Sequence, residues 1–435
     1  MEGRRTGARV DGELKAGTKA GQRMVELAEE HAADFASRAE QHDRENSYVA
    51  ENFDLMKTSG LLAAAAPEQF GGLGVESVHD ITVAISRLAR GCGSTAIAAN
   101  MHIGAVWVVT RAWQQGVAAG DPEVEDGLGR FLPILGQSLA VLSGAGTESG
   151  SAAFAFPQTT AAPVEGGYVI NGHKIFATNS EIADSITVFL KVPDGEGWYR
   201  SGIAIVLRGS PGMDVRGNWD ALGMRGSGSH DIVFTDCFVP EPMMMLGNPV
   251  GTFGTDGWPA VTTTNYALIG AFLGIAEAAR DLIVETAKTR RKQPFDILMA
   301  DRPATQFQVA EIDVQLTAAR AVLARTAQLL DEYFARPDTE LTTDDVHWMM
   351  HQWQCAKLVV NRAAADVVDR ALALTGGAGY LSSNPLSRLY RDVRAGPFMQ
   401  PLSPNEAFEY IGQVALGLDP FASDREALAR LRAGS

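Results

Sequence analysis

Residues 186–192 read Ile-Thr-Val-Phe-Leu-Lys-Val, with a branched apolar side chain at every second position. This alternation is typical of a β-strand with one buried face, because successive side chains of a strand point to opposite sides of the sheet. Three nearby segments, each bounded by Gly, Pro, Asn or Asp, are further strand candidates: 167–175, 203–207 and 232–239. The sequence therefore predicts a compact β domain in the middle of the chain.

Helical periodicity replaces this alternation on both sides of the predicted β domain. Apolar residues recur at helical spacing from about Met24 to Gly116, and again in long segments from Tyr266 onward. Helices this long, each with one wide apolar face, are typical of bundles. The expected fold class is α+β, in four segments: a polar tail (1–22), an N-terminal helical domain (23–136), a central β domain of barrel or sandwich type (137–247) and a C-terminal four-helix bundle (248–435).

The composition is that of a globular protein and argues against a membrane protein or a nonspecific nucleic-acid binder. The chain has 435 residues, of which 46% are hydrophobic, so each domain can bury a core of its own. No stretch reaches the roughly 18 to 20 apolar residues of a membrane helix, and residues 1–22 have no apolar run typical of a signal peptide. Three widely separated cysteines fit a reducing compartment, and a net charge of -15 argues against nonspecific nucleic-acid binding. We expect a cytoplasmic protein with neither a membrane nor a nucleic acid as partner.

Several common catalytic signatures are missing from the sequence. The histidines form no metal-ligand spacing, so no metal is expected, and no Gly-x-Gly-x-x-Gly follows a strand. Ser229, His230 and Asp231 are adjacent in the sequence, so their side chains cannot converge as a catalytic triad. The chemistry must therefore come from other residues.

Five strings rich in glycine and turn-forming residues lie in a fixed order along the chain. They are Pro67-Glu68-Gln69-Phe70-Gly71-Gly72-Leu73-Gly74, Thr147-Glu148-Ser149-Gly150-Ser151, Gly172-His173-Lys174-Ile175-Phe176-Ala177-Thr178-Asn179, Leu222-Gly223-Met224-Arg225-Gly226-Ser227, and Thr375-Gly376-Gly377-Ala378-Gly379-Tyr380 followed by Arg391-Asp392. Taken together and in this order, they resemble the acyl-CoA dehydrogenase family. The resemblance implies an FAD-dependent oxidoreductase with the α, β, α order expected above.

The resemblance places part of the flavin site in the β domain. Thr147 and Thr178 would contact the ring near its pyrimidine edge and near N5, where hydrogen-bond donors favour the reduced state. Phe176 stands where the family usually has a tryptophan that packs on the ring, and a smaller aromatic side chain can do the same. These three residues are the predicted cofactor contacts of the β domain.

The resemblance places a second part of the flavin site in the C-terminal helices. Arg290 and Arg291 resemble the family's arginine that binds the cofactor pyrophosphate by charge-assisted hydrogen bonds, and Arg291 is preferred. Three glycines allow close backbone approach in a turn that would meet the FAD of a neighbouring subunit: Gly376, Gly377 and Gly379. A homotetramer is therefore expected, because cofactor contacts would cross a subunit boundary.

The family's catalytic base is missing. Dehydrogenation of an acyl thioester needs a carboxylate that removes the α-proton, and the family's glutamate position after Arg391-Asp392 falls on Gln400, a neutral amide. Some members carry the glutamate where this chain reads Thr262-Thr263-Thr264-Asn265-Tyr266, with Asn265 in place of a frequent arginine. Glu406 and Glu409 lie further on and are expected to be solvated helix carboxylates. No catalytic base is identified, and Asn265 and Gln400 are predicted substrate contacts.

A second departure concerns the segment that helps to hold the acyl-CoA. The family often has Gly-Ser-Asp where this chain has Ser151-Ala152-Ala153-Phe154. Ser151 stays a predicted substrate contact, but the aspartate is lost. The sequence therefore indicates a substrate other than a standard fatty acyl thioester.

Three functions remain open on this sequence. The first is α,β-dehydrogenation of an unusual CoA- or carrier-bound acyl group, with FAD as cofactor and an electron-transfer flavoprotein as partner. The second is a two-component monooxygenase of the same fold, which receives reduced FAD or FMN from a flavin reductase, uses O2, and needs no carboxylate base. The third is a catalytically silent subunit that lends half of a shared flavin site.

Overall fold

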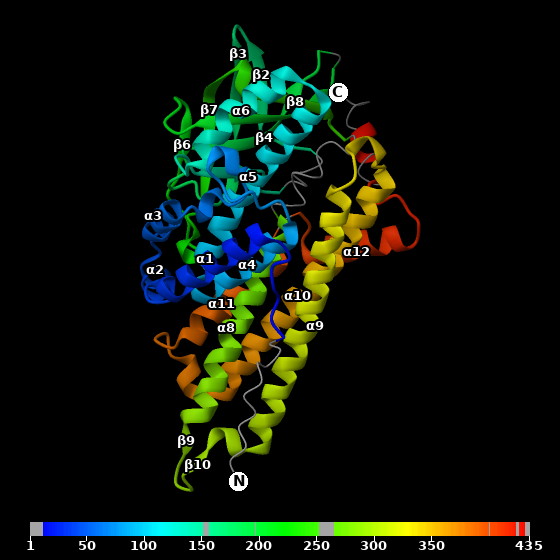
Figure 1. The fold of residues 1–435 in the computed structure, drawn as a ribbon. Helices are drawn as coiled ribbons and strands as arrows, with labels where there is room; N and C mark the ends of the chain where they lie inside the picture. Colours follow the sequence, from blue (N-terminus) through cyan, green and yellow to red (C-terminus); the bar gives the residue numbers. More distant parts are fainter. Residues whose placement is uncertain are drawn as a thin grey trace.

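The computed structural model describes residues 12–150, 156–195, 197–251, 265–399, 401–422 and 426–430. Helices come first along the chain, then a β-sheet, then long helices, and Figure 1 shows the sheet at one end of the molecule with the long helices extending away from it. This is the α+β fold class that the sequence predicted. No helix of the described segments is long and apolar enough to cross a membrane.

The N-terminal domain is helical, as expected. Its helices are α1 (Lys19–Phe35), α2 (Ala39–Glu45), α3 (Ala50–Ser59), α4 (Val78–Gly91), α5 (Gly93–Ala119) and α6 (Pro122–Gly136), with 3-10 turns η1 (Leu61–Ala63) and η2 (Glu68–Phe70) between α3 and α4. The loop 67–74 therefore joins helices. Gly72 is required there, because a Cβ on it would lie 2.1 Å from the carbonyl oxygen of Ala66.

Helix α1 begins inside the segment 1–22 that the sequence predicted as a polar tail. Thr18 caps the helix: its hydroxyl accepts a hydrogen bond from the Gly21 amide at 2.9 Å and donates to Asp80 at 2.6 Å. The Asp80 carboxylate also accepts from the Gly17 amide at 2.7 Å. The boundary shifts because a side chain of α4, distant in sequence, fixes the start of α1.

The β domain is one hydrogen-bonded sheet, where the sequence left a barrel and a sandwich open. Its strands are β1 (Leu142–Ala145), β2 (Thr160–Val164), β3 (Gly167–Ala177), β4 (Ser185–Pro193), β5 (Tyr199–Leu207), β6 (Met213–Val215), β7 (His230–Pro240) and β8 (Met244–Pro249). They are ordered β6-β7-β3-β2-β4-β5-β8, and β1 pairs with β4 in parallel. All four predicted strands are present. In β4 the apolar set of the alternation is buried, as predicted: Ile186, Val188, Leu190 and Val192.

The C-terminal domain is helical, as expected, and its described helices include three long ones and two shorter ones. They are α8 (Leu268–Thr289), α9 (Pro303–Phe334), α10 (Thr343–Thr375), α11 (Pro385–Val393) and α12 (Pro404–Ala415), with a hairpin of β9 (Arg291–Lys292) and β10 (Ile297–Leu298) after α8. Buried apolar residues of both helical domains belong to one cluster. At its edge Glu277 of α8 is buried and pairs with Arg90 of α4 and Arg320 of α9, each at 2.7 Å. The two helical domains are therefore packed as one body.

Candidate active site

The end of β3 presents an aromatic side chain to the surface. The pairing of β3 with β7 is irregular between Lys174 and Ala177, and Phe176 has a left-handed backbone with φ of 56°. This conformation is rare for a bulky residue, and such irregularities in sheets often re-aim a side chain beside an active site. Phe176 is 58% exposed and meets Trp219 edge to face, with the ring centroids 5.9 Å apart. The ring is therefore available to pack against a flat ligand, which fits the flavin contact predicted for it.

Hydroxyl groups line up beside Phe176. The Thr178 hydroxyl lies 2.9 Å from that of Ser229, which lies 2.8 Å from that of Ser227. The Thr178 carbonyl accepts a hydrogen bond from Ser143 at 2.6 Å. Ser229 is thus engaged in a hydroxyl chain and not in a triad. The neighbouring His230 instead bonds Glu181 at 3.1 Å.

Thr147 is held against β3 by a buried ion pair. Its carbonyl accepts from the Ile175 amide at 3.0 Å. The adjacent Glu148 meets Lys174 at 2.7 Å, and both side chains are buried. Burial disfavours the charged carboxylate, yet hydrogen bonds from Gln158, Lys174 and Thr159 hold the pKa of Glu148 below its usual value. The structure therefore brings Thr147, Phe176 and Thr178 together at one end of β3, whereas Ser151 lies outside the described residues.

The predicted contacts of the C-terminal helices lie elsewhere. Arg291 donates to the carbonyl of Asp296 at 2.7 Å within the β9–β10 hairpin, and Arg290 donates to the Thr375 carbonyl at 2.8 Å. The second bond ties the hairpin to the turn that contains Gly376, Gly377 and Gly379. Figure 1 shows this hairpin at the end of the molecule farthest from the β domain. Within one chain, these residues are not brought to Phe176.

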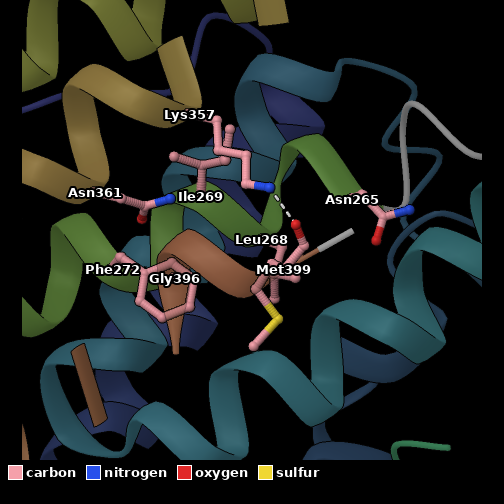
Figure 2. A pocket seen from close by; sticks show the side chains of 8 residues that line it. All are labelled: Asn265, Leu268, Ile269, Phe272, Lys357, Asn361, Gly396 and Met399. Atoms are coloured by element: carbon pink, nitrogen blue, oxygen red, sulfur yellow. Dashed lines mark hydrogen bonds between the residues drawn. The ribbon is translucent and has the colours of Figure 1, made fainter. Parts of the chain in front are cut away.

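A pocket opens between α8, α10 and the 3-10 turn η8 (Gly396–Phe398). The gaps between its lining atoms, open solvent included, amount to about 170 Å³, and they leave no room for a water-sized group unless lining side chains move. Figure 2 shows the side chains that line it: Asn265, Leu268, Ile269, Phe272, Lys357, Asn361, Gly396 and Met399. Two predicted substrate positions meet here, because Asn265 lines the pocket and Met399 directly precedes Gln400, which itself lies outside the described residues.

Lys357 is the charged side chain among the described residues that line this pocket. It is 2% exposed, and its ammonium group donates to the carbonyls of Met399 and of Leu402, the latter at 2.6 Å. Burial lowers the pKa of Lys357 to about 8, against the opposing effect of Glu406. The lysine therefore fixes the chain on both sides of position 400.

Asn361 lies one helical turn after Lys357 and is 3% exposed. Its Oδ1 atom has no hydrogen-bond partner among the described residues. A Cβ at Gly396 would lie 2.4 Å from this oxygen, so the glycine leaves room for it. A buried carbonyl oxygen without a donor is rare in folded proteins and points to a ligand or water that supplies one.

The sequence did not single out Lys357 or Asn361, although a signal was present. The buried face of α10 includes Met350, Trp353, Val360 and Ala364, and Lys357 and Asn361 interrupt it at helical spacing. Polar side chains within an apolar face need partners, so an interruption of this kind marks a candidate site.

Of the two carboxylates considered after position 400, Glu406 has a structural role. Glu406 accepts from the Ser403 amide at 2.7 Å and forms the capping box of α12. Glu406 and Glu409 are both exposed, as predicted for solvated helix carboxylates. Among the described residues that line the pocket there is no carboxylate.

The fold has the α, β, α order expected of a flavin-dependent oxidoreductase of this family, and comparison with known proteins agrees. Three family models match in order: the N-terminal domain of acyl-CoA dehydrogenase over residues 18–113, the middle domain over 144–237 and the C-terminal domain over 267–400. The chain belongs to the acyl-CoA dehydrogenase family, as the sequence motifs indicated. It is a flavoenzyme of that fold.

Individual relatives narrow the comparison. An amino sugar nitrososynthase from Streptomyces peucetius is 34% identical over 400 residues, which cover 92% of this chain and 94% of the relative. An L-evernosamine nitrososynthase from a Micromonospora species is 33% identical over 403 residues, 92% of each chain. The solved structure of KijD3 in complex with FMN and dTDP-3-amino-2,3,6-trideoxy-4-keto-3-methyl-D-glucose has a TM-score of 0.87 and 31% identity, covering 96% of this chain and 99% of that one. These similarities favour the second of the three open functions over the first.

Proposed function

We propose that this protein is a flavin-dependent monooxygenase that oxidises the amino group of a nucleotide-linked amino sugar. The observation that carries the proposal is the pocket beside position 400, whose described lining residues include no carboxylate. Such a site has no evident base for an α-proton, and an oxygen transfer to nitrogen needs none. The nitrososynthase relatives and the amino sugar bound by KijD3 support the same substrate class.

The proposed reaction balances with one reduced flavin and one O2 per step. The amine, O2 and reduced flavin give the hydroxylamine, water and oxidised flavin. A second cycle converts the hydroxylamine, O2 and reduced flavin into the nitroso compound, two waters and oxidised flavin. Because reduced flavin is consumed, the expected partner is a flavin reductase, and the cofactor is reduced FMN or FAD.

The residues at the end of β3 fit such a flavin. Bound there, the flavin supplies the electron pair that activates O2. Phe176 would pack on the ring, and the half-buried Thr178 hydroxyl, oriented by Ser229, would hydrogen-bond near N5. The buried Glu148–Lys174 pair would hold the Thr147 turn against the pyrimidine edge.

A second subunit completes the site in this proposal. Arg291 and the turn from Gly376 to Tyr380 lie far from Phe176 within one chain, so a flavin that contacts both groups requires two copies. Side chains near that end of the bundle are apolar and exposed, as expected of an assembly surface: Phe295, Phe307, Tyr380 and Leu381. A homotetramer with shared flavin sites fits these positions.

One paired experiment separates the open functions. The purified protein is mixed aerobically with reduced FMN or FAD and the dTDP-linked amino sugar named above, and the products are identified by mass spectrometry. In parallel, oxidised flavin on the protein is titrated anaerobically with acyl-CoA thioesters. We expect hydroxylamine and nitroso sugar in the first arm and no flavin bleaching in the second. Bleaching by acyl-CoA without amine oxidation supports the dehydrogenase, and a chain that binds flavin only with a homologous subunit supports the silent partner.

A further inference from the structure

The pocket between α8 and α10 combines apolar walls with one unpartnered acceptor. Leu268, Ile269 and Phe272 form its floor, and the carboxamide of Asn361 lies beside them (Figure 2). The Asn361 Oδ1 atom is buried without a donor within the described part of the chain. Because the pocket is closed to a water-sized group, a ligand has to displace lining side chains to enter; its N–H group would then satisfy this oxygen, and the apolar floor would contact the carbon skeleton that bears the N–H group.

The charge around this acceptor is positive. Lys357 of α10 is the charged residue among the described lining side chains, and Glu406 of α12, the carboxylate that acts to raise its pKa, is exposed and engaged in a helix cap. The described lining residues from α8 and η8 are uncharged. A cation disfavours a second cation nearby, so the pocket favours the neutral form of a basic ligand.

Nitrogen protonation decides whether an amine can be oxygenated. The nitrogen must offer its lone pair to the oxygen atom, and an ammonium group has none to offer. A carboxylate in the pocket would bind the amine as an ammonium ion and raise its pKa. An amide acceptor beside a fixed lysine does the opposite.

We propose that this pocket binds the amino group of the substrate as the free base, with Asn361 Oδ1 accepting an N–H hydrogen bond and Lys357 excluding the ammonium form. The inference rests on the proposed function and adds the protonation state and the position of the amino group. It also gives a physical reason for the neutral residues near position 400. A carboxylate there, which dehydrogenation requires, would hold the amine in its unreactive form.

The test is equilibrium binding to the flavin-free protein between pH 6 and 7.5, where Lys357 is still mostly protonated, by calorimetry. The probes are the dTDP-linked amino sugar and its analogue with a hydroxyl group in place of the amine. The ratio of the two dissociation constants is compared in this range because Lys357 stays charged there, so the pH dependence of the ratio reports the protonation of the amine. We expect the wild-type protein to prefer the amine increasingly as the pH rises, by up to about tenfold per pH unit below the amine's pKa.

Variants of Asn361 reverse or remove this preference. Asn361→Asp is expected to reverse the sign, so that the amine binds more tightly as the pH falls, while Asn361→Leu weakens binding of the amine at every pH. Tighter amine binding at low pH by the wild-type protein would overturn the proposal, and this result does not depend on whether either variant folds. If amine oxidation is observed together with that result, only this inference fails. If amine oxidation is absent and acyl-CoA bleaches the flavin, the proposed function fails.

Discussion

The end of β3 and the pocket between α8 and α10 differ in what they keep of the family pattern. At the end of β3, Thr147, Phe176 and Thr178 occupy the expected positions and lie together. In the pocket, the described lining has a lysine and two asparagines where a dehydrogenase needs a carboxylate. A fold can therefore keep one set of family residues while another set changes, which is why a family name does not give a reaction.

The largest expected effect on stability comes from breaking the buried ion pair between Glu148 and Lys174. Lys174→Met leaves Glu148 buried without its cation, and the free energy of unfolding should fall by about 3 to 5 kcal/mol. Urea denaturation measures this. The double variant Lys174→Met/Glu148→Gln should recover part of the loss. His173→Ala removes the neighbouring, more exposed pair with Asp231 and should cost less than about 1 kcal/mol. Equal losses in the two single variants would show that the buried pair does not anchor the strand.

In the pocket between α8 and α10, Lys357 should make the free energy of unfolding depend on pH. Its pKa is lowered from 10.5 to about 8 by burial, so between these pH values the unfolded chain holds a proton that the folded chain has released. Stability therefore rises with pH in this window. Relative to Lys357→Met, the wild-type free energy of unfolding should increase by about 3 kcal/mol from pH 8 to 10.5, at about 1.36 kcal/mol per pKa unit. A pH-independent difference between the two proteins would contradict a buried lysine with this pKa.

Removing the exposed ring at the end of β3 should affect flavin and leave the fold intact. Phe176→Ala is expected to weaken binding of reduced FMN or FAD by up to about tenfold, from a stacking energy of about 0.5 to 1.5 kcal/mol. Fluorescence titration measures the dissociation constants. Phe238→Ala, at another exposed phenylalanine of the β3–β7 pair, is the matched control and should leave flavin affinity unchanged. A similar loss in both variants would remove Phe176 from the flavin site.

The smallest effect should come from the chain of hydroxyl groups formed by Thr178, Ser229 and Ser227. Ser229→Ala removes the partner of Thr178 and should change stability by about 1 kcal/mol and flavin affinity only a few-fold. Thermal melts and flavin titration check this, with Ser149→Ala as an exposed control. Complete loss of flavin binding in Ser229→Ala would mean that the hydroxyl chain matters more than the aromatic ring.

The sequence predicted best those features that depend on residues close together in the chain. The alternation in 186–192 identified β4, because period-two burial is visible in the residues themselves, and the ordered strings identified the family. The start of α1 was not visible, since it depends on Asp80 of a different helix. The left-handed backbone of Phe176 is equally hidden, because it arises from the pairing of β3 with β7.

The candidate site was predicted in part for the same reason. Motifs pointed to Asn265 and to position 400. The structure adds Lys357, which bonds the carbonyls of Met399 and Leu402, and Asn361, which packs against Gly396. The separation of Arg291 from Phe176 within one chain required the three-dimensional arrangement.

The source of the transferred oxygen tests the central claim most directly. Single turnovers of the protein with reduced flavin, isotopically labelled O2 and the dTDP-linked amino sugar should give a hydroxylamine that carries one labelled oxygen atom on nitrogen. The same protein, kept anaerobic with oxidised flavin, should not be reduced by acyl-CoA. An unlabelled or unchanged amino sugar, together with anaerobic reduction of the flavin by an acyl-CoA, would contradict the account. That result would show that the protein is an acyl-CoA dehydrogenase.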